Sequence, residues 1–225
     1  MNTSPNNSSA DTFWNRRYKD EGVLWGETHS PTAGIAKRHF LQGSRILEIG
    51  FGYGRDLIFL AKEGFKMTGV EPSHEGLSMA KTRLVDSGIN VEQMHNGEFE
   101  TTQLPPAGFD GFFSHRFLHL LTTPEMVDSF LERLLYVTCP EAIICIGARN
   151  LTDLDPAQMI AFTDGVFEYR HRPGHRISYW GQQRFSEVFG RSFDVLEFVE
   201  VTEQESKDCS VPCHLTVMVA KKKTT

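Results

Sequence analysis

The sequence has 225 residues, of which 40% are hydrophobic, and a formal net charge of −6. This length suits one large domain, and no apolar run reaches the roughly 20 residues that cross a bilayer. Because acidic and basic residues are mixed, with one short basic cluster at 221–223, we expect a small-molecule partner, no nucleic acid and no membrane.

The N-terminal residues divide into a leader and a segment rich in aromatic residues. Residues 1–12 are polar, lack the pattern of a secretory signal and are expected to form a disordered leader. Residues 13–40 are expected to form a helical segment ahead of the main domain, which spans 41–225. Four cysteines without a secretion signal favour free thiols in a reducing compartment, which predicts a cytoplasmic protein.

Apolar segments of strand and helix character alternate along the first 150 residues. Strands are predicted at 45–49, 66–70, 91–94, 108–114 and 142–147, and helices at 56–63, 72–86 and 124–138. Helices at 156–162 and 183–189 and paired strands at 195–202 and 214–220 are predicted to follow. This order predicts an α/β fold: a doubly wound, mostly parallel sheet with an antiparallel C-terminal hairpin.

Three glycines follow the first predicted strand at every second position: Gly50, Gly52 and Gly54. Glycine allows positive φ and lets a ligand lie against bare backbone N–H groups, and the helix that follows favours an anionic group there. A dinucleotide motif would need glycine at position 55, where this chain has Arg55. The spacing therefore disfavours a nicotinamide-dependent oxidoreductase.

Together with Glu48, the loop reads E-x-G-x-G-x-G and resembles the first motif of class I S-adenosylmethionine-dependent methyltransferases. The order of elements is similar to the seven-stranded, Rossmann-like sheet of that family. The runs GFGYGRD, FLAKEGF and TGVEPS resemble the branch that contains tellurite-resistance and thiopurine methyltransferases. The resemblance implies S-adenosyl-L-methionine as cofactor and a small acceptor with a sulfur, oxygen, nitrogen, selenium or tellurium nucleophile.

The resemblance also assigns cofactor-binding residues. Glu71 ends the second predicted strand about 20 residues past the loop, where a carboxylate can bind ribose hydroxyls. Glu48 is expected to order the loop, and the segment after the third strand to meet adenine. The expected set is Glu48, Gly50, Gly52, Gly54, Arg55, Glu71, Pro72, Gly97, Glu98, Phe99 and Ser114.

The aromatic residues of the segment 13–40 are candidates for a lid. Trp14 and Tyr18 are four residues apart, so a helix presents both on one face, and Trp25 follows. By resemblance, such a segment covers cofactor and acceptor, and aromatic faces attract a sulfonium cation. An amphipathic helix that only packs on the sheet is the alternative.

Acceptor chemistry is expected past the fourth and fifth strands. His115 is the candidate base, because a protic nucleophile must lose its proton during methyl transfer. A histidine that is only hydrogen-bonded at a strand end remains an alternative, as does a solvated loop for the cluster at 169–180. The other expected acceptor-side residues are His119, Arg149, Tyr179 and Trp180.

Cys209, Cys213 and His214 could supply ligands to a soft metal ion. A second pair of ligands that would complete such a site is missing, so no metal is expected. The sequence therefore predicts a methyltransferase that acts on a small molecule, as a monomer or homodimer. A non-catalytic S-adenosylmethionine-binding sensor or partner subunit is the alternative.

Overall fold

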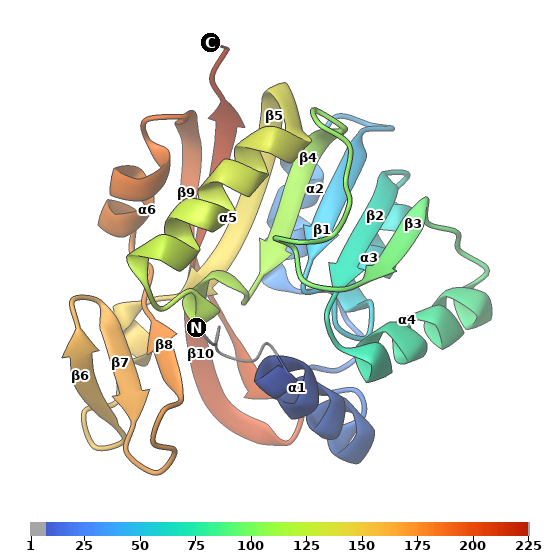
Figure 1. Cartoon of the computed structure of the whole chain (residues 1–225). Helices are drawn as coiled ribbons and strands as arrows, with labels where there is room; N and C mark the ends of the chain where they lie inside the picture. Colours follow the sequence, from blue (N-terminus) through green and yellow to red (C-terminus); the bar gives the residue numbers. More distant parts are fainter. Residues whose placement is uncertain (1–7, 225) are drawn as a thin grey trace, which may run out of the picture.

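A seven-stranded sheet forms the centre of the computed structural model, which describes residues 8–224 (Figure 1). Its strands follow the order β3-β2-β1-β4-β5-β10-β9, and β10 runs antiparallel to both β5 and β9. The strands are β1 (Arg45–Ile49), β2 (Lys66–Glu71), β3 (Gln93–Asn96), β4 (Phe109–His115), β5 (Thr138–Arg149), β9 (Phe193–Ser206) and β10 (Cys209–Lys222). The predicted doubly wound sheet with its antiparallel hairpin is confirmed.

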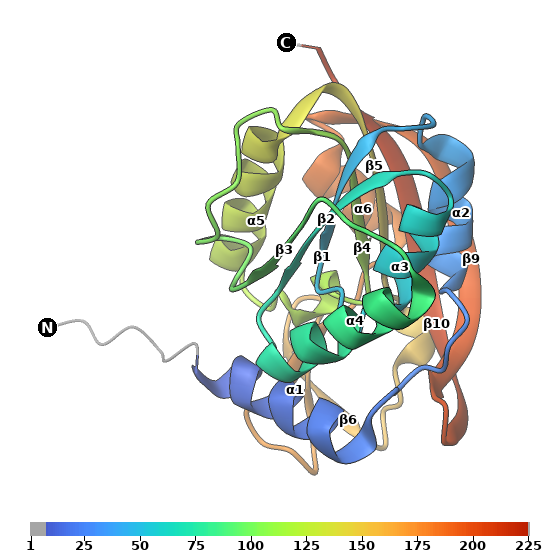
Figure 2. The same cartoon turned by 90° about the vertical axis from the view of Figure 1, so that its right-hand side faces the viewer.

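Helices cover both faces of this sheet, as Figure 2 shows from the side. One face packs against α2 (Pro31–His39), α3 (Arg55–Lys62) and α4 (His74–Ser87), and the other against α5 (Pro124–Val137) and α6 (Gln182–Phe189). Two separate apolar cores result, one on each side of the strands. None of the helices among the described residues combines the length and apolar character that crossing a membrane requires.

Local capping signals fix the ends of several helices. The Ser73 side chain accepts a hydrogen bond from the Gly76 N–H at the start of α4, and Gly88 ends that helix in the left-handed conformation with φ +65°. Thr123 caps α5 in the same way, ahead of Pro124 in its first turn. The residues that start and stop α4 are those predicted from the sequence.

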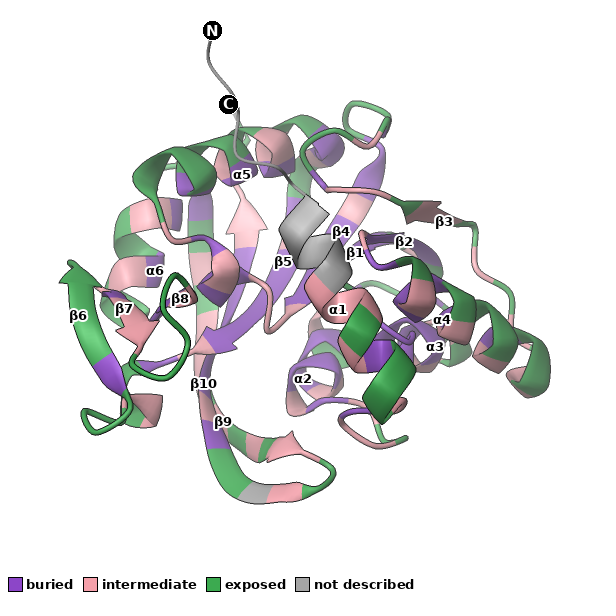
Figure 3. Ribbon diagram, turned by 60° about the horizontal axis from the view of Figure 1, so that its bottom comes forward, coloured by how far each residue is buried: buried purple, intermediate pink, exposed green. Residues whose placement is uncertain are grey.

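Three further elements lie at the carboxyl edge of the parallel strands: α1 (Ser8–Glu21), the short helix η1 (Leu118–Leu120) and a small antiparallel sheet (Figures 1 and 3). Residues 1–7 of the predicted leader lie outside the described residues, and α1 already begins at Ser8. In the segment 13–40, α1 lies over the edge, whereas α2 packs on the face of the sheet.

The small sheet corrects the helix predicted at 156–162. That stretch instead contains β6 (Met159–Thr163), which pairs with β7 (Val166–Tyr169), and β8 (Arg176–Ser178) pairs with β7 in turn. Thr163 faces Val166 across a two-residue turn, Asp164-Gly165, in which Gly165 has φ +66°. Asp-Gly between two strands is a hairpin signal, and the pairing that it allows outweighs the helical spacing.

Trp180 and Tyr179 are core residues, which corrects their prediction as pocket members. The Trp180 indole is fully buried, and its Nε1 donates to the Ser178 hydroxyl at 2.8 Å and to the Leu118 carbonyl at 3.2 Å. Tyr179 is buried edge-on against Phe167. These aromatic rings avoid solvent by joining the small sheet to the main domain.

We expect Trp180→Ala to lower the free energy of unfolding by about 3–5 kcal/mol, because it removes a large buried ring and leaves a cavity. Tyr136→Ala, at a half-exposed position on α5, should change it by about 0.5 kcal/mol or less. Urea unfolding followed by circular dichroism measures both. Equal losses in the two variants would contradict a core role for Trp180.

Candidate functional site

A cavity of about 960 Å³ lies at the carboxyl edge of the parallel strands, and we call it the edge cavity. Glu48, Glu71, His115 and Arg149, from the ends of β1, β2, β4 and β5, all line it. Helix α1 and the turn between β7 and β8 supply further walls. The chain order reverses between β1 and β4, and such switch points are where open α/β sheets bind ligands.

The glycine loop between β1 and α3 approaches its neighbours closely. Gly50, Gly52 and Gly54 have φ values of +66°, +55° and +79°. A Cβ on Gly52 would lie 2.5 Å from the Tyr18 hydroxyl, and one on Gly50 would lie 3.3 Å from the Phe117 ring. Both backbone conformation and space therefore require glycine at these positions.

Glu71 lies at the end of β2, as predicted, and is bonded to the glycine loop. Its carboxylate accepts the Gly52 N–H at 2.7 Å and the Ser73 N–H at 2.8 Å. The side chain is almost fully buried, yet it lines the edge cavity. Each carboxylate oxygen can accept more than one hydrogen bond, so Glu71 can also accept from a ligand in the edge cavity.

Glu48 is a buried acid without a full set of partners. Its side chain lines the edge cavity, and its Oε2 has no hydrogen-bond partner among the described residues. Burial, reinforced by the nearby charges of Asp56 and Glu71, raises its pKa well above the ordinary value of 4.5. A cation bound beside Glu48 would reverse that shift, so this corner of the edge cavity favours a positive ligand group.

The remaining predicted cofactor residues separate into two groups. Arg55, Pro72 and Glu98 line the edge cavity, together with Gly50 and Gly52. The structure does not place Gly54, Gly97, Phe99 or Ser114 on its wall. Phe99 instead packs in the core between the sheet and α5, within 6 Å of the Phe112 and Phe130 ring centroids.

The predicted aromatic residues of the lid form one cluster over the edge. Trp14 stacks on Tyr18 with ring centroids 5.9 Å apart, and Trp25 stacks on Tyr53 of the glycine loop at 6.2 Å. The Tyr53 hydroxyl donates to the Gly26 carbonyl and accepts the Trp25 N–H. All three predicted lid residues line the edge cavity.

His115 lines the edge cavity, but both of its ring nitrogens are occupied by protein groups. Nδ1 lies 2.9 Å from the Thr32 hydroxyl, and Nε2 lies 2.8 Å from a Glu203 carboxylate oxygen. Glu203 also forms ion pairs with Arg116 at 3.5 Å and Arg55 at 3.6 Å. This arrangement suits a residue that positions its neighbours better than a free base.

Sequence reasoning missed Glu203 and Arg116. Glu203 lies on β9, one residue beyond the predicted strand 195–202, and nothing in the nearby sequence connects it with a histidine 88 residues away. Arg116 follows His115 directly and has φ +58°, an uncommon value for a residue other than glycine. The position of Arg116 at a strand end was a usable signal.

His119 and Arg149, the other predicted acceptor-side residues, both line the edge cavity. Burial, with added repulsion from Arg149 and Arg116, lowers the pKa of His119 well below 6.5 and keeps its ring neutral. The Arg149 guanidinium donates to Asp153 at 2.7 Å. Among the described residues, His119 Nδ1 has no hydrogen-bond partner.

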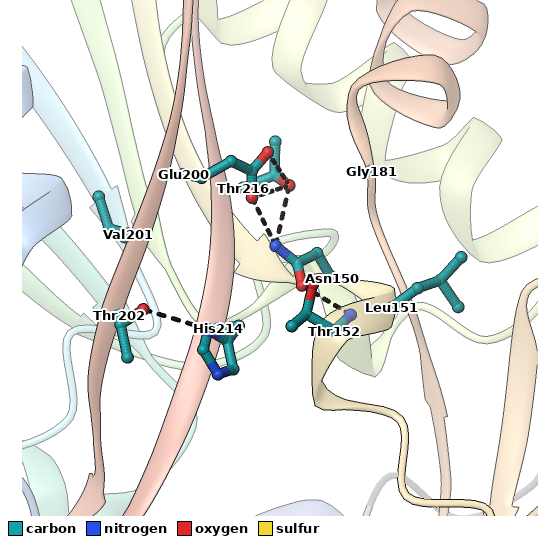
Figure 4. A pocket seen from close by; sticks show the side chains of 9 residues that line it. All are labelled: Asn150, Leu151, Thr152, Gly181, Glu200, Val201, Thr202, His214 and Thr216. Atoms are coloured by element: carbon teal, nitrogen blue, oxygen red, sulfur yellow. Dashed lines mark hydrogen bonds between the residues drawn. The ribbon is translucent and has the colours of Figure 1, made fainter.

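A second hollow, of about 370 Å³, lies beside β9, β10 and the short helix η2 (Leu151–Asp153) (Figure 4). Its polar groups bond to one another. Asn150 donates to Glu200 at 2.5 Å, the Thr216 hydroxyl donates to the same carboxylate at 2.9 Å, and Thr202 lies 3.1 Å from His214. Because these groups satisfy one another, this hollow needs no ligand.

The cysteines are separate thiols. Cys213 is buried and Cys209 is partly exposed, both on β10. Within residues 8–224, no three His, Cys, Asp or Glu side chains gather in a way that could hold a metal ion.

Residues 46–141 match a family model described as a methyltransferase domain. EEF1A lysine methyltransferase 2 of Danio rerio is 25% identical over 66% of this chain and 72% of its own. The 23S rRNA (uracil(747)-C(5))-methyltransferase of Pyrococcus abyssi is 28% identical over 51% of this chain, which spans 28% of that longer protein.

Solved structures share the fold. The 1,6-didemethyltoxoflavin-N1-methyltransferase of Burkholderia thailandensis, solved with 1,6-didemethyltoxoflavin and S-adenosylhomocysteine, aligns with a TM-score of 0.76 and 17% identity over all of this chain and 92% of its own. TehB from Haemophilus influenzae aligns with a TM-score of 0.63 and 14% identity, over 95% of this chain and 67% of its own, and shares the fold. Together the comparisons show that residues 46–141 are similar to a methyltransferase domain and that the chain shares its fold with solved methyltransferases.

The Glu203 network should make stability depend on pH. Burial opposes ionisation of Glu203, but His115, Arg116 and Arg55 outweigh it and lower its pKa from 4.5 to about 2. Ionised Glu203 therefore stabilises the fold above pH 4.5, and this contribution is lost as the pH falls toward 2. Glu203→Gln should lower the free energy of unfolding by about 3 kcal/mol at neutral pH.

Urea unfolding at a series of pH values tests this. The difference between wild type and Glu203→Gln should shrink steadily in acid, whereas Asp194→Asn, exposed on the same strand, should stay near wild type throughout. A difference that does not change between neutral pH and acid would rule out the ionised network.

Proposed function

We propose that this chain uses S-adenosylmethionine to methylate a small-molecule acceptor in the edge cavity. One observation carries the proposal: two buried carboxylates, Glu48 and Glu71, flank the glycine loop inside a cavity that α1 and the β7–β8 turn wall off. When bound, the cofactor supplies an electrophilic methyl group on a sulfonium cation.

The residues around the glycine loop suit this cofactor. Glu71 is proposed to accept hydrogen bonds from the ribose hydroxyls, since its oxygens are already oriented by the Gly52 and Ser73 N–H groups. Glu48, buried with an oxygen that lacks a partner among the described residues, is proposed to balance the cofactor's positive charge. Glu98 and Pro72 line the wall where adenine is expected.

Catalysis is proposed to rest on orientation and exclusion of water. Trp14, Tyr18 and Trp25 line the edge cavity and are proposed to cover it. An in-line displacement gains most from holding the two reacting atoms about 3 Å apart in a dry site. His115 is proposed to hold Glu203 and Thr32 in place, because hydrogen bonds to these residues occupy both ring nitrogens.

The walls of the edge cavity and the net charge of the chain support the proposal of a small-molecule acceptor. Relatives of this domain are named for acting on 23S rRNA and on a lysine of EEF1A, so the fold alone leaves the acceptor open. The net charge of −6 disfavours a polyanionic acceptor. The walls over the edge cavity favour a ligand that can be surrounded. A cytoplasmic location and a monomeric or homodimeric state stay predictions from the sequence.

The cofactor assignment is tested by calorimetry with S-adenosylhomocysteine. We expect wild type to bind it and Glu71→Gln to raise the Kd at least about tenfold, because hydrogen bonds to a charged acceptor contribute about 1.5–3 kcal/mol each. Glu92→Gln, an exposed acid at the start of β3, is the matched control. An unchanged Kd for Glu71→Gln would refute the ribose contact.

The acceptor class is tested by methyl transfer from radiolabelled S-adenosylmethionine into a cell extract that is separated by filtration. We expect the label to appear in the low-mass filtrate. Label that is retained by the filter and released by protease would instead indicate a protein acceptor, and retained label released by nuclease would indicate an RNA acceptor. Binding of S-adenosylhomocysteine without labelling of either fraction would favour the non-catalytic sensor or partner subunit.

A further inference from the structure

The charges that line the edge cavity change sign along its length. Acids follow β1, β2 and β3, whereas arginines follow β4 and β5 and occupy the β7–β8 turn and β8. We call these the cofactor half and the basic half. The cofactor half contains Glu48, Glu71, Glu98 and Glu100, and the basic half contains Arg116, Arg149, Arg172 and Arg176.

Arg17 on α1 and Glu125 on α5 also line the edge cavity, outside this division of the strand ends, and Arg17 pairs with Glu21 at 2.9 Å. Two exceptions within the halves themselves are paired in the structure. Arg55, in the cofactor half, lies 3.7 Å from Asp56 and 3.6 Å from Glu203. Glu205, in the basic half, lies 2.9 Å from Arg116 and 3.4 Å from Arg149. The change of sign therefore separates two regions, one suited to a cationic cofactor and one to a ligand of the opposite charge.

Arg116 and Arg149 are held rigidly in the basic half. Arg116 has a positive φ at the end of β4, and its guanidinium lies 5.3 Å from the centre of the Trp25 ring as well as against Glu205. Arg149 donates to Asp153, and its Nη1 reaches the Tyr169 hydroxyl at 3.5 Å. A backbone held at an uncommon φ, as at Arg116, is often found at ligand sites.

Arg172 differs from these two arginines. It lies on the exposed turn between β7 and β8 and lines the edge cavity. It makes no side-chain hydrogen bond or ion pair with the residues whose side chains the structure describes, 13–209 and 211–224. Its positive charge contributes to lowering the pKa of Glu21 on α1, but the two side chains do not pair. An unpaired guanidinium at the mouth of the basic half is available to a ligand.

The environment of His119 agrees with a positive basic half. After burial, the largest influences that lower its pKa are the charges of Arg149 and Arg116. The positive charges that act on this buried ring also favour a negative ligand group beside it.

We propose that the basic half of the edge cavity binds an acceptor that carries a carboxylate, and that Arg172 pairs with this group at the cavity mouth. The proposal rests on the proposed methyltransferase function and names the acceptor class. A carboxylate matches the planar, two-pronged donor geometry of guanidinium groups. It also supplies the negatively charged partner that Arg172 lacks among the described side chains.

Calorimetry tests the proposal with pairs of ligands that differ only in charge, on protein saturated with S-adenosylhomocysteine. The pairs are benzoate with benzamide and indole-3-acetate with indole-3-acetamide. We expect at least one acid to bind about tenfold more tightly than its amide, with a preference that weakens as salt is raised. Equal binding within both pairs, tighter amides, or no binding of either acid would overturn the proposal.

Two variants locate the charge. Arg172→Gln should reduce the preference for acids about fivefold, as expected for an exposed pair, and leave the Kd of S-adenosylhomocysteine unchanged. Arg170→Gln removes an equal charge two residues away, where Arg170 is exposed and does not line the edge cavity, and should keep the preference. A preference that falls equally in both variants, or in neither, would refute the role of Arg172.

The two levels of proposal fail differently. If S-adenosylhomocysteine does not bind at all, the methyltransferase function is wrong. If it binds and the acids show no preference, the function stands and the carboxylate-bearing acceptor is wrong.

Discussion

The rest of the site depends on Glu71, Glu203 and Glu48, three carboxylates at one edge of the sheet that are largely shielded from water. An ionised carboxylate removed from water costs several kcal/mol unless other groups compensate it. Glu71 is compensated by two backbone N–H groups, and Glu203 by His115 and two arginines. Glu48 keeps an oxygen without a partner in the described part of the chain. Protein groups therefore compensate two of these acids, whereas the third, Glu48 beside the glycine loop, lacks a partner for one oxygen among the described residues.

The sequence predicts those features whose causes lie within a few residues. Gly50 and Gly52 need positive φ, Ser73 caps the helix that it precedes and Gly88 ends that helix, so each conformation is encoded where it occurs. Alternating buried strands and helices then allow few arrangements other than a doubly wound sheet. For these reasons both the fold and the position of Glu71 could be predicted before any coordinates.

Contacts between distant segments could not be predicted in this way. His115 was a reasonable base candidate at a strand end, but Glu203, 88 residues later, occupies its Nε2. Trp180 was assigned to a pocket because a loop tryptophan is otherwise exposed, whereas the small sheet that buries it depends on the hairpin at Gly165. In each case a pairing of distant strands decides the role of a residue whose local sequence is ambiguous.

The same distinction explains why the cofactor is easier to infer than the acceptor. The methyltransferase-domain match covers residues 46–141, which contain the glycine loop and every acid of the cofactor half. It ends before Arg149, Arg172 and Arg176, three of the four arginines of the basic half. The hairpin that carries Glu203 and Glu205 also lies beyond it. Because three of the four arginines of the basic half come from this unmatched part of the chain, the acceptor must be inferred from the side chains of the basic half themselves.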